Sequence, residues 1–283
     1  MSNLQQLSLY AAIPPAKLPH VLSVLAAVTG MRAIPTAQHH IVFSPTSPLS
    51  ASAHRGSLAG AGGAPLESSR IDVRRDIPLH TNRTQKDEND DGTSSKYSQW
   101  TLTIPTIPDA AKRPVQVQQI SKTVFVPVKY TSDDSTDSSK AEDEANTSML
   151  FRFLRALDYV YAYDYIERGR IFVYQGIVII SVTEIAPQSP PQLHEIPVSD
   201  GDNELVADTV ARGRVIENAK FINTWIVHAY VEVLSGVDSV GDELQKMKLA
   251  TDKLENLKAE VSGIVELVAP DRGLLDPRVQ IRR

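Results

Sequence analysis

The sequence predicts a mostly β (α+β) fold, in which about eight antiparallel strands close into a β-barrel flanked by an N-terminal and a C-terminal helix. Two patterns indicate this fold: several stretches alternate apolar and polar residues, and one early and one late stretch repeat apolar residues at helical spacing. In addition, a strongly twisted sheet keeps unpaired edges unless it closes, which favours a barrel.

The first 44 residues read as a strand, a helix and a second strand. Apolar side chains at every second position of 7–13 indicate a strand, which two prolines end. Apolar residues at three- and four-residue steps over 18–28 indicate an amphipathic helix. Gly30 follows as its C-terminal cap, because glycine accepts positive φ. Residues 37–44 are the next strand.

Two stretches, 45–95 and 131–147, are low in complexity. Small, proline-rich or charged residues dominate them, so they offer too little apolar surface to offset the entropy of ordering. We expect both to be insertions without regular structure, apart from some order near residues 71–79. Because the patterned pieces between them are too small to fold alone, we expect 1–283 to be a single domain.

The middle of the chain predicts two strands and a short helix. Residues 99–104 alternate cleanly, and apolar residues from Ile120 to Tyr130 fall on one face with Val124 among them. Residues 148–156 place leucines and a phenylalanine at helical spacing.

Residues 159–185 have the most strand-like pattern in the chain. Tyrosines at every second position from 159 to 165 are expected to line one strand face, and 167–170 (Glu-Arg-Gly-Arg) is expected to be the turn of a hairpin. A last strand is predicted over 221–234. A final helix begins near Ser239, keeps its apolar phase to Val268 and stops before Pro270.

Composition limits the classes of function. The formal net charge is −5, whereas a protein that binds phosphate backbones needs a basic surface, so we expect no direct contact with nucleic acid. The absence of cysteine excludes disulfides and thiolate chemistry and fits a reducing compartment. Without a secretory signal or an apolar run of membrane-spanning length, we expect a nuclear or cytosolic protein with no membrane association.

Catalytic motifs do not emerge from the sequence. Barrels that hydrolyse triphosphates place two glutamates at i and i+2 on one strand, so that both carboxylates share a divalent metal in the lumen. The only such spacing here, at 142–144, lies inside the acidic insertion. Glu184 and Glu232 are isolated and expected to face solvent or end strands. His39 and His40 are adjacent, so their rings point to opposite sides of a strand, and a surface or turn position is expected. We predict no catalytic residue, no metal and no cofactor.

Candidate binding residues are aromatic or basic. The tyrosine row suggests either core packing or partner contact, because tyrosine is common at interfaces and also stabilises sheets. Arg152, Arg155, Arg168 and Arg170 suggest either a solvated surface or a grip on a phosphate or an acidic peptide. Residue type selects five candidates for a partner interface: Tyr159, Tyr161, Tyr163, Arg168 and Trp225.

Two parts of the chain also carry a family resemblance. They contain LSLYAAIP, VLSVLAAVTGM and HHIVFSP near the start, and FRFLRALDYVYAYDYIERGRIFVYQGIVIISVTEI further on. In these parts, roughly residues 4–44 and 148–280, the chain resembles subunit 18 of the Mediator complex head module, of filamentous-fungal type. The family often has glycine where this chain has Asp158, and Asp also visits the left-handed region.

The resemblance implies a nuclear β-barrel that forms a heterodimer with the related barrel of Mediator subunit 20. It also implies that a C-terminal helix of Mediator subunit 8 tethers the pair to other head-module subunits and, indirectly, to RNA polymerase II. Family members share the fold of RNA triphosphatases without their metal-binding glutamates, so the resemblance implies no enzymatic activity.

Two functions are therefore compatible with the sequence. The first is a structural and interaction subunit of the Mediator coactivator, and the alternative is a triphosphate-hydrolysing barrel metalloenzyme resembling an RNA triphosphatase. The feature that separates them is whether carboxylates converge inside the barrel near a basic residue.

Overall fold

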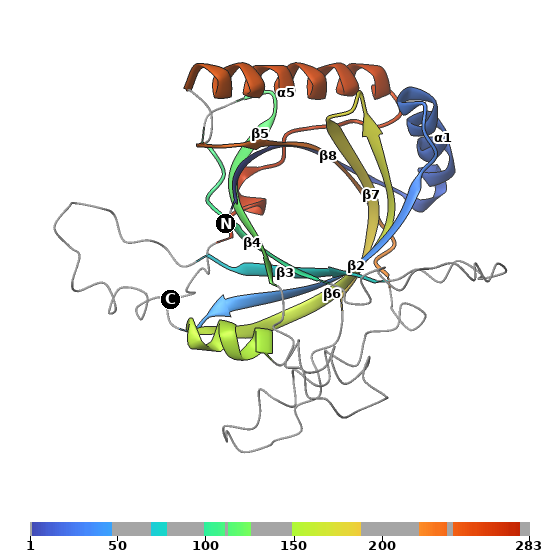
Figure 1. Cartoon of the computed structure of the whole chain (residues 1–283). Coiled ribbons are helices and arrows are strands. Elements are labelled where there is room, and N and C mark those ends of the chain that lie inside the picture. The colour runs from blue at the N-terminus through green and yellow to red at the C-terminus, as the bar shows by residue number, and fades with distance from the viewer. Residues whose placement is uncertain are drawn as a thin grey trace, which may run out of the picture.

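The computed structural model describes residues 2–46, 69–77, 99–110, 113–125, 149–187, 221–236 and 240–277. Within these ranges eight strands close into an antiparallel barrel in the order β1-β5-β4-β3-β2-β6-β7-β8 (Figure 1), which confirms the predicted fold. The strands are β1 (Ser2–Ile13), β2 (Ile34–Pro45), β3 (Ile71–Asp76), β4 (Trp100–Pro105), β5 (Gln116–Phe125), β6 (Tyr159–Tyr174), β7 (Val178–Pro187) and β8 (Trp225–Leu234).

The N-terminal elements form as their sequence predicts. β1 ends before Pro14, the short helix η1 (Pro15–Lys17) follows, and α1 (Leu18–Thr29) begins with a proline in its first turn. Gly30 takes φ 67°, the left-handed conformation that ends α1. The chain then enters β2, which pairs with β3 and β6.

β3 lies where some order was expected within the 45–95 stretch, near residues 71–79. Its residues, Ile71–Asp76, pair with both β2 and β4, and Ile71 and Val73 are buried. Because this stretch is short and lies within a polar context, the sequence indicated some order there but did not define a strand. The rest of 45–95, apart from 45, 46, 69, 70 and 77, lies outside the described residues, as does 131–147.

The other elements of the middle region follow the prediction with one exception. β4 matches its alternating pattern, and a helix covers 149–156. β5 begins earlier than expected, at Gln116, and Val124 is 50% exposed instead of buried on the strand's apolar face. Asp158 takes φ 63° at the turn into β6, in agreement with the left-handed position expected there.

The predicted turn at 167–170 is wrong, because β6 runs unbroken through it. The hairpin reverses instead at Gln175 (φ 49°) and Gly176 (φ 77°). Gly169 serves close packing within the sheet: a Cβ built there would lie 2.1 Å from the Val182 carbonyl oxygen on β7. Glycine is therefore needed for space and not for positive φ.

The tyrosines of β6 do not line one face, because a β-bulge divides them. Val42 on β2 pairs with Tyr163 and the next residue, Phe43, pairs with Tyr161, so β6 carries one extra residue between them. Such an insertion turns the following side chains to the other face. Tyr161 therefore packs outside the barrel, whereas Tyr163 lies on the lumenal face with Tyr165.

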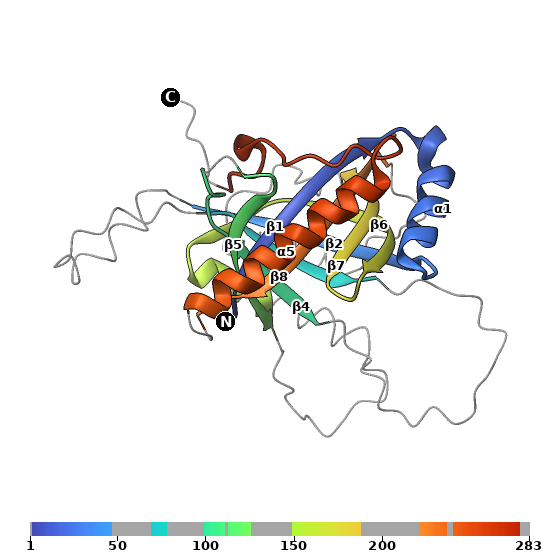
Figure 2. The same ribbon diagram turned by 90° about the horizontal axis from the view of Figure 1, so that it is seen from above.

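The apolar core lies outside the barrel, in two clusters. The larger lies beneath α1 and α5 (Val240–Val261), and α5 crosses the outside of the wall (Figures 1 and 2). It joins outward residues of β1, β6, β7 and β8, including Leu9, Phe172 and Val182. The smaller lies beneath helix 149–156 and includes Phe43 and Trp100. Among the described helices, none combines the length and hydropathy required to cross a bilayer.

The C-terminal helix ends earlier than its apolar phase predicts. α5 stops at Val261, and Val268 instead forms a two-way backbone bridge with Tyr10 on β1, at 2.8 and 2.9 Å. The chain continues through η3 (Arg272–Leu274). The carbonyl of Leu275 accepts from Gln118 Nε2 at 3.2 Å, so this segment lies against β1 and β5. The expected start at Ser239 lies outside the described residues.

Candidate functional site

Polar side chains line the lumen of the barrel. Strand pairing places them on the face opposite the outer clusters, because side chains alternate along each strand. The inward residues include Gln6, Ser8, Tyr10, Gln38, His40, Asp72, Lys122, Tyr165, Glu167, His228, Tyr230 and Glu232. The interior of an eight-stranded barrel is just wide enough to be filled by side chains. Because many of those side chains are polar or charged here, the lumen is the candidate functional site.

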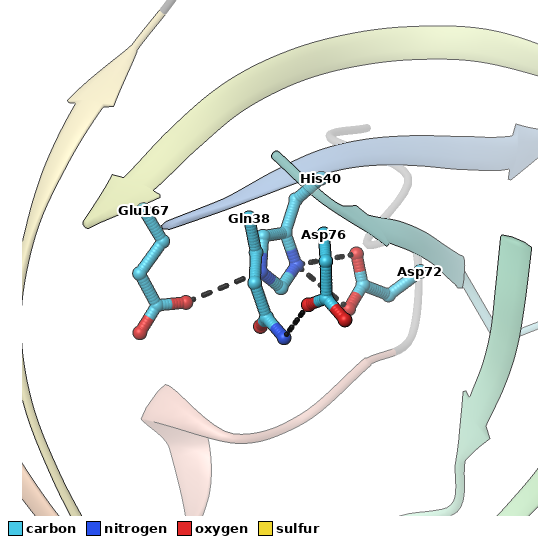
Figure 3. Close-up of polar contacts among 5 residues, drawn as sticks. All are labelled: Gln38, His40, Asp72, Asp76 and Glu167. Carbon is cyan, nitrogen blue, oxygen red and sulfur yellow. Dashed lines mark hydrogen bonds and ion pairs between the residues drawn. The ribbon is translucent and has the colours of Figure 1, made fainter. Parts of the chain in front are cut away.

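His40 joins three neighbouring strands inside the barrel (Figure 3). It projects from β2, with Asp72 on β3 to one side and Glu167 on β6 to the other. Its Nδ1 lies 3.2 Å from both carboxylate oxygens of Asp72, and its Nε2 lies 3.2 Å from Oε2 of Glu167. Since both neighbours are acceptors, both ring nitrogens carry a proton.

The surroundings of His40 hold its positive charge. Burial alone lowers the pKa of His40, but the charges and hydrogen bonds of Asp72 and Glu167 outweigh burial and raise the pKa to about 9. Burial likewise raises the pKa of Glu167, and the hydrogen bond and charge of His40 outweigh it and lower that pKa below its usual value. The three residues therefore form an ionised group at neutral pH.

Two further contacts extend this group. Gln38 donates from Nε2 to Oδ1 of Asp76 at 2.8 Å, which adds a second lumenal link between β2 and β3 (Figure 3). The ring of Tyr165 stacks on His40, with 4.6 Å between centroids and 8° between planes. The stack fixes the orientation of the imidazole between its two carboxylates.

The other lumenal histidine, His228 on β8, is held neutral. Its ring stacks between Tyr10 at 4.2 Å and Tyr230 at 4.6 Å, and its Nε2 lies 3.1 Å from Oγ of Ser8. Burial lowers the pKa of His228 to about 4, and the charge of Glu167 offsets only part of this effect. His40 is therefore positively charged at neutral pH and His228 is neutral, because only His40 has a carboxylate at each ring nitrogen.

Three lumenal carboxylates, those of Asp72, Glu167 and Glu232, lie beside cationic side chains and do not share one position. Asp72 and Glu167 lie at opposite nitrogens of His40, and Glu232 forms an ion pair with Lys122. In the part of the chain that the structure describes, no group of three or more His, Asp or Glu side chains is placed to hold a metal ion. The arrangement links neighbouring strands of the barrel to one another.

The expectation that His39 and His40 lie at the surface is wrong. They are 1% and 4% exposed, with rings on opposite sides of β2 as their adjacency predicts. His39 faces outward, where its Nε2 lies 2.9 Å from Oδ2 of Asp164. The signal that identifies these sites is an acidic residue, Asp164 or Glu167, inside a strongly apolar strand, because such a residue needs a buried partner.

Glu184 and Glu232 were expected to face solvent or to end strands, but each lies within a strand beside a cationic side chain. Glu184 is 7% exposed; its Oε1 accepts from Nε of Arg168 at 2.7 Å and forms an ion pair with Nη2 at 2.7 Å. Glu232 faces the lumen beside Lys122. Each carboxylate tolerates its position because it has a cationic partner.

The five residues predicted for a partner interface fall into separate environments. Tyr159 and Tyr161 pack beneath helix 149–156, and their hydroxyls donate to the Ser69 carbonyl at 3.1 Å and to Asp164 at 2.7 Å. Trp225 packs against the larger outer cluster. Tyr163 remains 44% exposed and the side chain of Arg168 43% exposed. The guanidinium group of Arg168 also lies 3.7 Å from the centroid of the Phe221 ring.

Comparisons with known proteins give one consistent result. The family model described as Med18 protein matches residues 5–278. Subunit 18 of the Mediator of RNA polymerase II transcription from Yarrowia lipolytica is 28% identical over 283 residues, covering 98% of this chain and 100% of the relative. The Eremothecium gossypii subunit 18 is 22% identical, with 97% of each chain covered. A chain in the structure of the Schizosaccharomyces pombe Mediator head module has the same fold, with a TM-score of 0.55, 14% identity, and 94% and 98% coverage.

Proposed function

This chain belongs to the Med18 protein family, and from that premise we propose that it is a structural, non-enzymatic subunit of the Mediator head module, acting in RNA polymerase II transcription in the nucleus. The observation that carries the proposal is a family match spanning almost the whole chain, accompanied by a relative aligned along its full length. The closed barrel with its core on the outside supports it, because such a scaffold is rigid and leaves helices available for contacts.

We propose two direct partners: the related barrel of Mediator subunit 20 and a C-terminal helix of Mediator subunit 8. Other head-module subunits and RNA polymerase II are then reached through them. Of the five predicted interface residues, Tyr163 and Arg168 are the ones that we propose to touch a partner, because they keep 44% and 43% exposure. Tyr159 and Tyr161 pack in the smaller outer cluster and Trp225 packs in the larger one, so we assign these three residues a packing role.

Co-expression with both partner homologues tests this proposal. We expect the full chain to co-purify with the subunit 20 homologue and the subunit 8 helix as one stoichiometric complex. The variant Tyr163→Ala should weaken this complex by about tenfold, whereas Leu274→Ala, at an 80% exposed residue of η3, should leave it unchanged. A chain that is folded but retains neither partner would refute the assembly role.

The alternative, a triphosphate-hydrolysing metalloenzyme, receives no support from the lumen. Its chemistry requires carboxylates that share one divalent ion, whereas Asp72 and Glu167 are separated by the imidazole of His40. A phosphate-release assay with tripolyphosphate and manganese tests this alternative. Turnover that is lost in Glu167→Gln would establish it and overturn the non-enzymatic proposal.

A further inference from the structure

Helix 149–156 is fixed firmly to the barrel through its inner face (Figure 1). Leu150 and Leu154 are fully buried against the smaller outer cluster, and Phe151 meets Phe43 edge to face with 5.1 Å between centroids. A helix anchored in this way holds its outer face in one orientation. Partner binding there would carry little ordering cost.

The outer face of this helix keeps large apolar side chains in water. Phe153 is 46% exposed and Leu157, one residue beyond the helix, is 51% exposed. Leu157 follows Phe153 by four residues and lies in the turn that ends the helix, so these two side chains, the apolar pair, lie on neighbouring parts of the surface. Phe125 from β5 supports the pair from one side, with 6.1 Å between its ring and that of Phe153. A supported pair is a stronger indication of binding than single exposed residues.

Positive charge accompanies this apolar pair. Arg152 and Arg155 are both exposed, and 149–157 contains no acidic residue, although the chain as a whole carries a net charge of −5. Both arginines also have interactions within the chain. Complementary charge around an apolar contact steers and orients a partner.

We propose that the face formed by Arg152, Phe153, Arg155 and Leu157 docks an acidic amphipathic helix of a partner protein. Apolar side chains of that helix cover Phe153 and Leu157, and its carboxylates lie near the two arginines. Between them, Ala156 is small and exposed, so a second helix can approach closely. The proposal rests on the proposed function, since it adds a further docking surface to an assembly subunit.

Binding of a synthetic peptide to the full-length chain tests the proposal. The probe is a fluorescein-labelled helical peptide of about 15 residues, with Leu and Phe at three- and four-residue steps and Asp or Glu elsewhere. Fluorescence anisotropy should report saturable binding that weakens as salt rises. A scrambled peptide of equal composition and a version with Lys in place of Asp and Glu should bind at least about tenfold more weakly.

Variants of the chain locate the site. Phe153→Ala with Leu157→Ala should weaken binding at least about tenfold, and Arg152→Glu with Arg155→Glu should weaken it similarly and remove the salt dependence. Leu244→Ala, which alters a 66% exposed residue of α5, is the matched control and should bind as the unaltered chain does. Thermal melting of each variant establishes that it is folded.

Three results would overturn the proposal. They are no saturable binding to the folded chain, equal binding by all variants, and equal binding of the scrambled peptide. Sedimentation velocity adds a fourth: a dimer that Phe153→Ala with Leu157→Ala abolishes would assign this face to a second copy of the chain. Because the peptide assay uses the isolated chain, its failure leaves co-purification with the subunit 20 homologue intact, and the two proposals fail separately.

Discussion

Along β8, neighbouring residues face opposite environments. Val227, Ala229 and Val231 point outward into the apolar cluster beneath α5, whereas His228 and Tyr230 point into a lumen that also contains the Lys122–Glu232 ion pair. The outer face of the barrel wall gains its stability from apolar burial, in the manner of an ordinary core. The inner face consists of paired charges and stacked rings. These contacts link particular neighbouring strands and contribute less apolar burial than the outer face does. Substitutions on each face can test this difference between the outer and inner sides of the wall.

The largest effect should come from the outer face. Leu254 on α5 is fully buried in the larger cluster, so Leu254→Ala should lower the free energy of unfolding by roughly 3 to 5 kcal/mol. Leu244→Ala on the same helix, at a residue that is 66% exposed, should change it by no more than about 0.5 kcal/mol. Urea unfolding measures both. Similar losses in the two variants would mean that α5 is not an essential part of the core.

The ionised lumenal group should give the next largest effect, as a pH dependence. The folded pKa of His40, about 9, exceeds the ordinary value of 6.5, so the stability it adds is fully present below pH 6.5 and is lost as pH rises through about 9. The expected loss is about 3 kcal/mol, from a pKa difference of about 2.5 units. Urea unfolding at several pH values should show it in the unaltered chain.

Two histidine variants sharpen that test. His40→Gln should remove most of the alkaline loss, whereas His228→Gln should keep it. The pKa of His228 is lowered to about 4, so its contribution is present above pH 6.5 and is lost as pH falls toward 4. An alkaline loss that persists unchanged in His40→Gln would show that the lumenal group is not the source.

The wall itself gives a smaller effect. Gly169→Ala would place a Cβ within 3 Å of backbone atoms of Val182 and Thr183, so β6 and β7 must move apart, and we expect a loss of about 1 to 3 kcal/mol. Gly273→Ala in η3 is the control, since its nearest neighbouring atom is 3.5 Å from the added Cβ. Thermal melting compares the two. Equal melting temperatures would mean that the sheet tolerates the added atom.

The smallest effect should come from a polar contact on the outer face. Tyr161→Phe removes the hydroxyl that donates to buried Asp164 at 2.7 Å, and should cost about 1 kcal/mol. Tyr163→Phe, on the opposite face beyond the bulge, is the matched control and should change stability less. Reversed effects in urea unfolding would contradict the assignment of faces.

Alternation of apolar and polar residues was sufficient to predict the barrel class and most strands. It shows that two faces differ but not which face is the interior, so the inward residue Glu232 was expected to face solvent or to end a strand. The turn at 167–170 was misplaced because its residues resemble a loop. In fact Glu167 faces His40, Arg168 pairs with Glu184, and Gly169 makes room for β7.

Long-range pairing explains what the sequence could not indicate at the candidate site. The contact of His40 with Asp72 and Glu167 depends on the order of β3, β2 and β6, and the carboxylates come from segments far from His40 in the chain. Similarly, the bulge that divides the tyrosines depends on the register of β6 against β2, which residue type alone does not specify. In contrast, the left-handed turn at Asp158 is a local property and was anticipated.

Closure of the barrel joins the first strand of the chain to the last, since β1 pairs with β8 over ten residues from Leu4 to Ile13. During synthesis on the ribosome β1 emerges first, yet its partner is made on the order of tens of seconds later. For that interval the apolar side of β1 is not covered by α5, which follows β8 in the chain. Because β1 cannot complete its pairing until β8 has been made, a truncated product that lacks β8 should be removed by cellular proteolysis instead of accumulating as a partial barrel.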